Sequence, residues 1–150
     1  MLKDLLLNSD VVFFDDARTL QGQELGTSLR QLLPSRTPAN RLCLLCFDTS
    51  IEAIALFAAL IDDGYVPILM DINTPNVVLQ KLIDEYRPSL IVRASDDGSR
   101  LVSETEYADV RRYMADDIAV FVPTSGSTGF PKLVALSFAG LVASARATAE

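Results

Sequence analysis

Residues 41–70 read RLCLLCFDTSIEAIALFAALIDDGYVPILM, with one short apolar run before and one after a longer apolar run. The outer runs, Leu42–Phe47 and Val66–Met70, are continuous rather than alternating, which is typical of strands buried on both faces. The longer run between them has almost no polar position, so we expect a helix buried nearly all round. Strand, helix and strand in this order predict two parallel strands joined by a right-handed helical crossover.

The ends of the expected helices are marked by specific residues. Thr49 and Glu52 have capping-box spacing, so the first helix is predicted to begin there and to end at Gly64, where a positive φ is allowed. Thr74 is a candidate N-cap for a second helix, with Pro75 at its first helical position. The apolar residues of this second helix that are expected to face inward are Val78, Leu79, Leu82 and Ile83.

Further apolar runs extend this pattern along the chain. Leu90–Val92, Ile118–Val122 and Leu133–Leu136 read as additional short strands. The first two are as apolar and continuous as the strands at 42–47 and 66–70, and we expect all four in one sheet. The predicted fold class is therefore α/β, with a mostly parallel sheet and flanking helices.

The remaining segments are less regular. A strand at Val11–Phe14 and a helix over Gly22–Leu33 are expected near the N-terminus, and the polar segment Arg93–Asp117 reads as a surface connection. The helix that begins at Phe138 has no cap or breaker before Glu150, so the sequence reads as one cut within a helix.

The composition excludes several classes of function. The chain has 150 residues, 49% of them hydrophobic and 22% charged, which is typical of one globular domain and not of a disordered protein. Thirteen Lys and Arg against twenty Asp and Glu give a net charge of −7, which repels nucleic-acid phosphates and anionic membranes. The chain has no His, so imidazole metal sites and His-based catalysis are excluded.

No membrane or export signal is recognisable. The longest apolar run, Ala53–Ile61, is about half of the ~20 residues that a bilayer span requires, and the N-terminus lacks the features of a signal peptide. We therefore expect a soluble, cytoplasmic protein with no nucleic-acid or membrane partner.

Cys43 and Cys46 have the spacing of a redox or half-zinc motif. They lie within the expected strand Leu42–Phe47, however, and side chains three residues apart on a strand point to opposite faces. The two sulfur atoms are therefore predicted to be out of reach of each other, and both cysteines are predicted to be buried, free thiols.

A loop rich in hydroxyls and glycine joins the last two predicted strands and reads TSGSTGFPK over residues 124–132. Glycines let backbone N–H groups point into one concavity, hydroxyls add neutral donors, and the lysine adds a positive charge; this set suits phosphate. A Walker A loop is excluded because Pro131 precedes Lys132 and a strand follows. On composition alone, a flexible connection between strands is the alternative. The candidate site residues are Thr124, Ser125, Gly126, Ser127, Thr128, Gly129 and Lys132.

This loop resembles the phosphate-binding signature of the adenylate-forming enzymes, which include acyl-CoA synthetases, adenylation domains of nonribosomal peptide synthetases, and luciferases. The resemblance covers essentially the whole chain, and the loop is its specific part. Two positions depart from the family pattern: Leu133 replaces a Gly or small residue, and Phe138 stands where a His often follows. The other similar segments, in the same order as in the family, are Arg18–Leu20, Thr49–Glu52, Tyr65–Leu69 with Asp71, and Leu79–Val92.

The resemblance implies the fold of the opening subdomain of the family's N-terminal domain. It also implies use of ATP and Mg²⁺ to convert a carboxylic acid into an acyl-adenylate with release of pyrophosphate, followed by transfer to a thiol of CoA or a carrier protein. In that reading the loop hydroxyls and Lys132 bind the β and γ phosphates.

In the family the adenine pocket, the acidic metal ligand and the catalytic lysine all follow the loop. Residues 1–150 are accordingly expected to form a partial domain that is inactive alone and self-associates through uncovered apolar faces. A different interpretation is a non-catalytic α/β binding or scaffold module. A reading frame that continues past Glu150 into an aromatic-Gly-x-Thr-Glu segment would support the enzyme.

Overall fold

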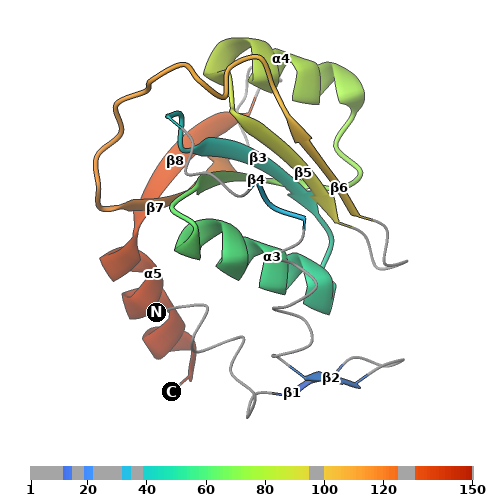
Figure 1. Cartoon of the computed structure of the whole chain (residues 1–150). Coiled ribbons are helices and arrows are strands. Elements are labelled where there is room, and N and C mark those ends of the chain that lie inside the picture. The colour runs from blue at the N-terminus through green and yellow to red at the C-terminus, as the bar shows by residue number, and fades with distance from the viewer. Residues whose placement is uncertain are drawn as a thin grey trace.

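The structure, a computed structural model, describes residues 12–14, 19–21, 32–34, 39–94, 100–124 and 131–149. Its centre is a six-stranded sheet with the strand order β6-β5-β3-β4-β7-β8, and a separate antiparallel pair is formed by β1 and β2 (Figure 1). The strands are β1 (Val12–Phe14), β2 (Thr19–Gln21), β3 (Leu42–Phe47), β4 (Val66–Asp71), β5 (Leu90–Ala94), β6 (Arg100–Glu104), β7 (Ile118–Thr124) and β8 (Lys132–Ser137).

The middle of the sheet is parallel. Strand β3 pairs in parallel with both β4 and β5, and β4 pairs in parallel with β7. Strands β6 and β8 lie at the two edges and pair antiparallel with β5 and β7. The prediction that the strands at 42–47, 66–70, 90–92 and 118–122 share one mostly parallel sheet is confirmed.

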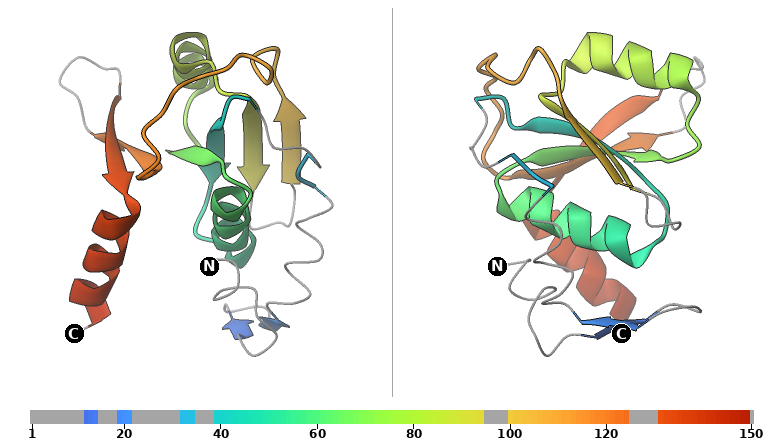
Figure 2. Two further views of the ribbon diagram at one scale, coloured as in Figure 1. Left: turned by 60° about the vertical axis from the view of Figure 1, so that its left-hand side comes forward. Right: turned by 45° about the vertical axis from the view of Figure 1, so that its right-hand side comes forward.

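Helices cover the two faces of the sheet. Helix α3 (Ile51–Asp62) lies on one face and α4 (Asn76–Tyr86) on the other, while α5 (Phe138–Ala149) follows β8 and extends away from them (Figures 1 and 2). The α3 face contains a core cluster with Leu45, Leu56 and Val92, and the α4 face contains one with Leu44, Ile68 and Leu82. Burial of apolar side chains on both faces explains why the parallel strands are apolar at successive positions.

The two cysteines belong to different core clusters. Cys43 packs in the cluster on the α3 face, and Cys46 packs in the cluster on the α4 face. Both are buried, free thiols, as the strand periodicity predicts.

The buried side chain of Asn40 connects the start of β3 to two later segments. Its Nδ2 donates to the carbonyl oxygens of Arg87 at 2.8 Å and Tyr107 at 3.3 Å, and its Oδ1 accepts from the backbone N–H of Leu42 at 3.1 Å. Asn40 is 1% exposed, so these bonds satisfy the polar atoms of its buried side chain. The side chain thereby fixes the end of α4 and the segment after β6 against the sheet.

The predicted starts of two helices need correction. The N-cap of α3 is Ser50 rather than Thr49: the Ser50 side chain accepts from the backbone N–H of Ala53 at 3.3 Å, and Ser50 has the extended backbone of a cap. For α4 the N-cap is Pro75 rather than Thr74, and it has no side-chain capping bond. Each helix thus begins one residue later than predicted, whereas Gly64 has the predicted positive φ of 85°.

The segment 93–117 is also more ordered than predicted, because it contains β6. Strand β6 lies at the edge of the sheet and is partly exposed, as Leu101 shows. It therefore contains polar residues and lacks the continuous apolar run that identifies the central strands. Most of the helix predicted over 22–33 lies outside the described residues; Leu32 and Leu33 themselves are in a turn. Among the described residues, no helix has both the length and the apolar character needed to cross a membrane.

Candidate phosphate-binding site

The two described ends of the predicted loop are joined across the β7–β8 ladder. Thr124 is the last residue of β7, Lys132 is the first residue of β8, and the two are register partners. The Thr124 hydroxyl donates to the Lys132 carbonyl oxygen at 3.2 Å. Both side chains are exposed, and among the described residues Lys132 has no ion-pair partner.

Five of the seven candidate residues lie outside the described residues, so their placement stays a prediction. They are Ser125, Gly126, Ser127, Thr128 and Gly129. The strands also reach further into the predicted loop than expected, because β7 includes Pro123 and Thr124 and β8 includes Lys132. The hydroxyl and the cation at the loop's ends are therefore anchored in a paired ladder.

Asp71 of β4 and Thr124 of β7 lie at the same edge of the sheet. The two strands are parallel and pair through Ile68 and Phe121, and they end at Asp71 and Thr124. This edge holds the carboxyl ends of the parallel strands, where open α/β sheets bind their ligands. The Asp71 carboxylate itself accepts from the backbone N–H of Asn73 at 2.7 Å and thereby shapes the turn after β4.

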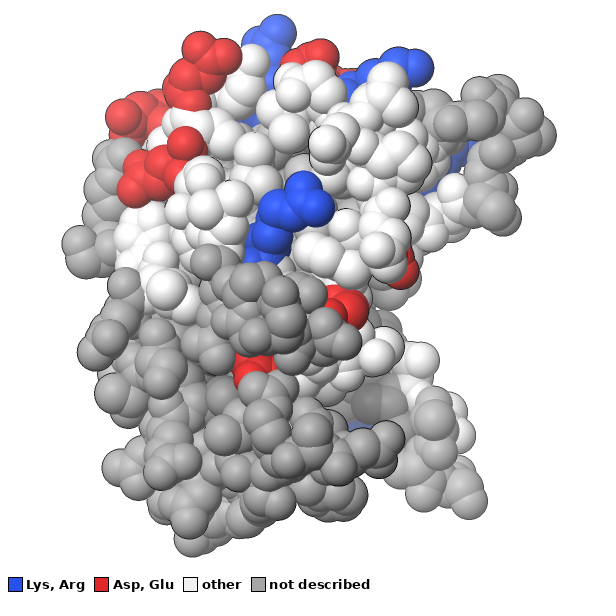
Figure 3. Space-filling view, turned by 90° about the vertical axis from the view of Figure 1, so that its right-hand side faces the viewer, with Lys and Arg blue, Asp and Glu red and all other residues white. Residues whose placement is uncertain are grey.

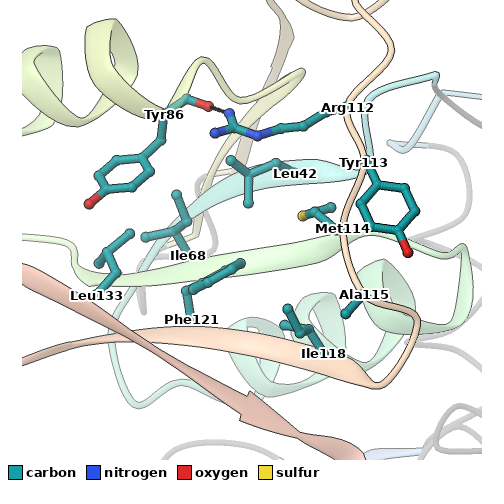
Figure 4. Close-up of a pocket in the computed structure, with 10 residues that line it drawn as sticks. All are labelled: Leu42, Ile68, Tyr86, Arg112, Tyr113, Met114, Ala115, Ile118, Phe121 and Leu133. Atoms are coloured by element: carbon teal, nitrogen blue, oxygen red, sulfur yellow. Dashed lines mark hydrogen bonds between the residues drawn. The ribbon is translucent and has the colours of Figure 1, made fainter.

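A pocket on the α4 face was not predicted from the sequence. It has a volume of about 390 Å³, and Figure 4 shows its apolar side chains gathered in front of β3, β4 and β7. Arg112 donates from Nη1 to the carbonyl oxygen of Tyr86 at its rim (Figure 4). The lining residues are Leu42, Ile68, Tyr86, Arg112, Tyr113, Met114, Ala115, Ile118, Phe121 and Leu133.

The chemistry of this pocket differs from that of the loop. Its lining has no carboxylate or thiol, and its polar side chains are those of Tyr86, Arg112 and Tyr113. Leu133 of β8 lines the pocket, but its neighbour Lys132 does not. Neighbouring side chains on a strand point to opposite faces of the sheet. The sequence signal that could have identified it is the short Tyr113-Met114-Ala115 run within an otherwise polar segment.

No protein-family profile matches the chain. Curated proteins match at moderate identity: novobiocin biosynthesis protein H of Streptomyces niveus is 29% identical over 143 residues, which cover 79% of this chain and 24% of that protein. The nonribosomal peptide synthetase imqB of Aspergillus flavus is 30% identical over 115 residues, which cover 65% of this chain and 4% of the synthetase. The chain thus spans a quarter or less of the length of these relatives.

Solved structures match over nearly the whole chain. ATP-bound MatB from Rhodopseudomonas palustris has a TM-score of 0.69 and 20% identity, with 97% of this chain and 36% of MatB covered. The N-terminal subdomain of Klebsiella oxytoca NpsA, in complex with 3-hydroxyanthranilyl-AMSN, has a TM-score of 0.62 and 20% identity, with 90% of this chain and 38% of that chain covered. The chain therefore has the fold of these solved structures and corresponds to about a third of the length of each.

Proposed function

We propose that this chain is the opening part of an enzyme that uses ATP to activate a carboxylic acid as an acyl-adenylate, and that residues 124–132 bind the β and γ phosphates. The observation that carries the proposal is the pairing of Thr124 with Lys132 at the carboxyl edge of the sheet. This pairing sets a hydroxyl and an exposed cation at the ends of a loop rich in glycine and hydroxyls, in the fold of the solved structures reported above.

The chemistry of these residues fits a departing pyrophosphate. Negative charge grows on the β phosphate as the bond to the α phosphate breaks, and donors fixed in advance at that position lower the barrier. Lys132 supplies a full positive charge. The Thr124 hydroxyl has one proton, so it would donate to phosphate only by giving up its bond to the Lys132 carbonyl oxygen. The backbones of both residues are held in a paired ladder, which fixes where their side chains start.

Magnesium would be held mainly by the nucleotide in this proposal. Among the described residues no group of three or more His, Cys, Asp or Glu could bind a metal ion. Mg²⁺ commonly keeps substrate phosphates and waters as ligands and takes only one or two from the protein. This part of the chain would contribute a loop hydroxyl at most.

The substrate and acceptor classes rest on the family resemblance. A carboxylic acid would be the substrate, and the thiol of CoA or of a carrier protein would accept the acyl group. We expect residues 1–150 alone to be inactive, because the loop by itself does not hold the carboxylate in a near-attack position. A non-catalytic phosphate-binding module is the second candidate, and the same loop would serve it.

Calorimetric titration of the 150-residue chain with inorganic triphosphate tests the loop directly. We expect binding, and we expect Lys132→Ala to weaken it by about ten-fold or more, as for loss of one charge-assisted contact. Lys81→Ala is the matched control, because Lys81 is an exposed lysine on α4. Equal affinity in all three proteins would contradict the phosphate-loop assignment.

A separate measurement distinguishes the enzyme from the module. Carboxylate-dependent exchange of pyrophosphate into ATP is expected from a longer protein that contains this chain, and it is expected to depend on Lys132. Exchange by the 150-residue chain itself, above its Lys132→Ala variant, would contradict the prediction that this part is inactive alone. Triphosphate binding without exchange in the longer protein would favour the module.

A further inference from the structure

Three arginines line a second pocket, at the edge of the sheet where the parallel strands begin. The pocket has a volume of about 310 Å³. It lies where three segments meet: the residues just before β3, the end of α4, and the connection from β6 to β7, which passes that end of the helix in Figure 1. The arginines are Arg87, Arg111 and Arg112, and the other lining residues are Asn40, Asp84, Glu85 and Val110.

Arg87 has a backbone conformation that arginine rarely adopts. It follows the last residue of α4 with φ of 49° and ψ of 58°, and among the described residues no other non-glycine residue has a positive φ. Glycine is the usual residue at this position, because a Cβ atom disfavours the left-handed region. The side chain extends over Tyr107, with the guanidinium carbon 5.7 Å from the ring centroid, and lines the pocket. Such conformations cluster at functional sites, which makes Arg87 a candidate for ligand contact.

The three guanidinium groups are not neutralised by the protein. All three arginines are exposed, and none forms a salt bridge within the described part of the chain, although two carboxylates line the same pocket. The Asp84 carboxylate accepts instead from Nε2 of Gln80 at 2.8 Å. Arg112 uses one N–H group, which donates to the carbonyl oxygen of Tyr86 (Figure 4). Each guanidinium has five N–H groups, so most of these donors are available to a ligand.

The negative end of the α4 dipole lies at this pocket, but the last carbonyl groups of the helix have donors. The carbonyl oxygen of Ile83 accepts from the backbone N–H of Arg87 at 2.8 Å, and that of Arg87 accepts from Nδ2 of Asn40 at 2.8 Å. The Tyr86 carbonyl oxygen accepts from Arg112. These hydrogen bonds offset the partial negative charge that would otherwise repel an anion.

The charge around the pocket is opposite in sign to that of the chain. Three guanidinium groups against the carboxylates of Asp84 and Glu85 leave one net positive charge, whereas the whole chain has a net charge of −7. On the face of the body shown in Figure 3, by comparison, basic side chains lie singly among uncharged ones. The pocket therefore favours an anion where the rest of the chain disfavours one.

Phosphate is the anion that three arginines suit best. A guanidinium group binds phosphate through two parallel N–H···O bonds. A phosphate monoester has three acceptor oxygens and about 1.5 to 2 negative charges at neutral pH, whereas a carboxylate has two oxygens and one charge. The pocket also has room for a small organic group beside the phosphate, and Val110, which is 51% exposed, offers that group an apolar contact.

We propose that Arg87, Arg111 and Arg112 bind a small phosphate monoester at a site distinct from the predicted phosphate loop. The loop follows β7 at the carboxyl ends of the parallel strands, whereas this pocket lies at their amino ends. The six residues of β3 separate the two edges by about 20 Å. None of the pocket's lining residues comes from β7, β8 or α5, so the site does not depend on the phosphate-loop proposal.

Calorimetric titration with glycerol 3-phosphate tests the site. The 150-residue chain with Lys132→Ala is the reference protein, because this substitution weakens binding at the predicted loop. We expect saturable binding, and we expect Arg111→Gln or Arg87→Gly in this background to raise the dissociation constant by about ten-fold or more. Glycine suits the backbone of residue 87, so Arg87→Gly removes the charge without straining the fold. Arg146→Gln is the matched control, because Arg146 is an exposed arginine on α5.

Two further measurements test the ligand class and the openness of the pocket. Succinate, a dicarboxylate without phosphate, is expected to bind about ten-fold or more weakly than glycerol 3-phosphate. A longer protein that contains this chain is expected to show the same Arg111-dependent binding, which distinguishes an open site from one that another segment covers. Circular dichroism checks that every variant is folded.

Four results would each overturn the proposal. They are the absence of saturable binding, equal affinity in the Arg111→Gln and Arg146→Gln proteins, succinate binding as tight as that of glycerol 3-phosphate, and loss of the Arg111-dependent binding in the longer protein. Each would leave triphosphate binding by the loop unaffected.

Discussion

Thr124 and Lys132 are register partners at the end of the β7–β8 ladder, and the Thr124 hydroxyl donates to the Lys132 carbonyl oxygen at 3.2 Å. The bond uses the backbone of Lys132 and leaves its ammonium group exposed. A residue of the loop is thus held in place through its main chain while its charge stays available to a ligand.

In a longer protein that contains this chain and has the proposed activity, Lys132→Ala is expected to reduce kcat/KM for ATP by about ten- to a hundred-fold, since a hydrogen bond to a charged group contributes about 1.5 to 3 kcal/mol. The loss should affect kcat as well as KM, because the contact strengthens as pyrophosphate departs. Gly126→Val is expected to reduce kcat/KM for ATP more than Lys132→Ala does, since a β-branched side chain disfavours positive φ and hinders approach of the backbone to phosphate. Ser127→Ala is expected to reduce it less. Three folded variants with unchanged kinetics would show that the loop does not bind ATP.

Asn40→Ala is expected to lower the free energy of unfolding by about 2 to 4 kcal/mol, because it removes three hydrogen bonds in a buried site. The carbonyl oxygens of Arg87 and Tyr107 would lose their Asn40 donor, and the N–H of Leu42 would lose its acceptor in a buried bond. Urea denaturation of the 150-residue chain measures the change. Asn73→Ala in an exposed turn is the control, with an expected change within about 0.5 kcal/mol. Similar losses in both variants would contradict the role given to Asn40.

Ser50→Ala is expected to destabilise the protein by about 1 kcal/mol, as is usual for loss of an N-cap side chain. Thr49→Ala is expected to change stability by less than about 0.5 kcal/mol, because Thr49 is exposed and does not cap α3. Thermal or urea unfolding of the two variants compares neighbouring residues directly. A larger destabilisation by Thr49→Ala than by Ser50→Ala would instead support the capping box that the sequence alone suggests, with Thr49 as the N-cap.

The stability of the chain is expected to fall at alkaline pH because of its buried thiols. Burial raises the pKa of the Cys43 thiol far above its usual range, and burial also raises that of Cys46, an effect that the Arg93 guanidinium partly offsets. A raised pKa means that the unfolded chain loses the proton first, so this contribution to stability is complete below the ordinary thiol pKa of about 8.5 and is lost as pH rises above it.

Between pH 8.5 and 10 the Cys43 contribution amounts to about 2 kcal/mol. Between these two pH values, the free energy of unfolding measured with urea is expected to fall less for Cys43→Ala than for the unaltered chain. Parallel curves for the two proteins would mean that the Cys43 thiol ionises as readily in the folded state as in the unfolded state.

The sequence best predicts the strands that are buried on both faces along their whole length. Strand β3 is apolar at every position because both of its faces are covered, and its bounds match the prediction. The edge strand β6 was missed because its exposed side accepts polar residues, which read as a loop. Cap positions were displaced by one residue because Thr49 and Ser50 are chemically similar, and only the backbone conformation distinguishes the N-cap from its neighbour.

The ends of the candidate site were predictable for a different reason. The glycines, hydroxyls and lysine of the loop TSGSTGFPK indicate phosphate binding without knowledge of the fold. The two strands that flank the loop are recognisable in the sequence as apolar runs. That Asp71 ends the strand next to the one that ends at Thr124 was not predictable, because it depends on β4 and β7 being neighbours in the sheet. Strand neighbours separated by so much sequence are set by the packing of the whole domain and not by local preference.

The strand order also has a consequence for the course of folding. Strands β3, β4 and β5 come from one continuous stretch of chain, residues 42–94, whereas β7 reaches its place beside β4 across the intervening β6 and its connection. Contacts of low sequence separation form with less loss of chain entropy than distant ones. The β5–β6 and β7–β8 pairings are the most local in the sheet, so we expect these hairpins to form before β7 docks beside β4. The segment assigned to phosphate binding is thus the turn of a hairpin that is expected to form early and to join the sheet through a distant contact.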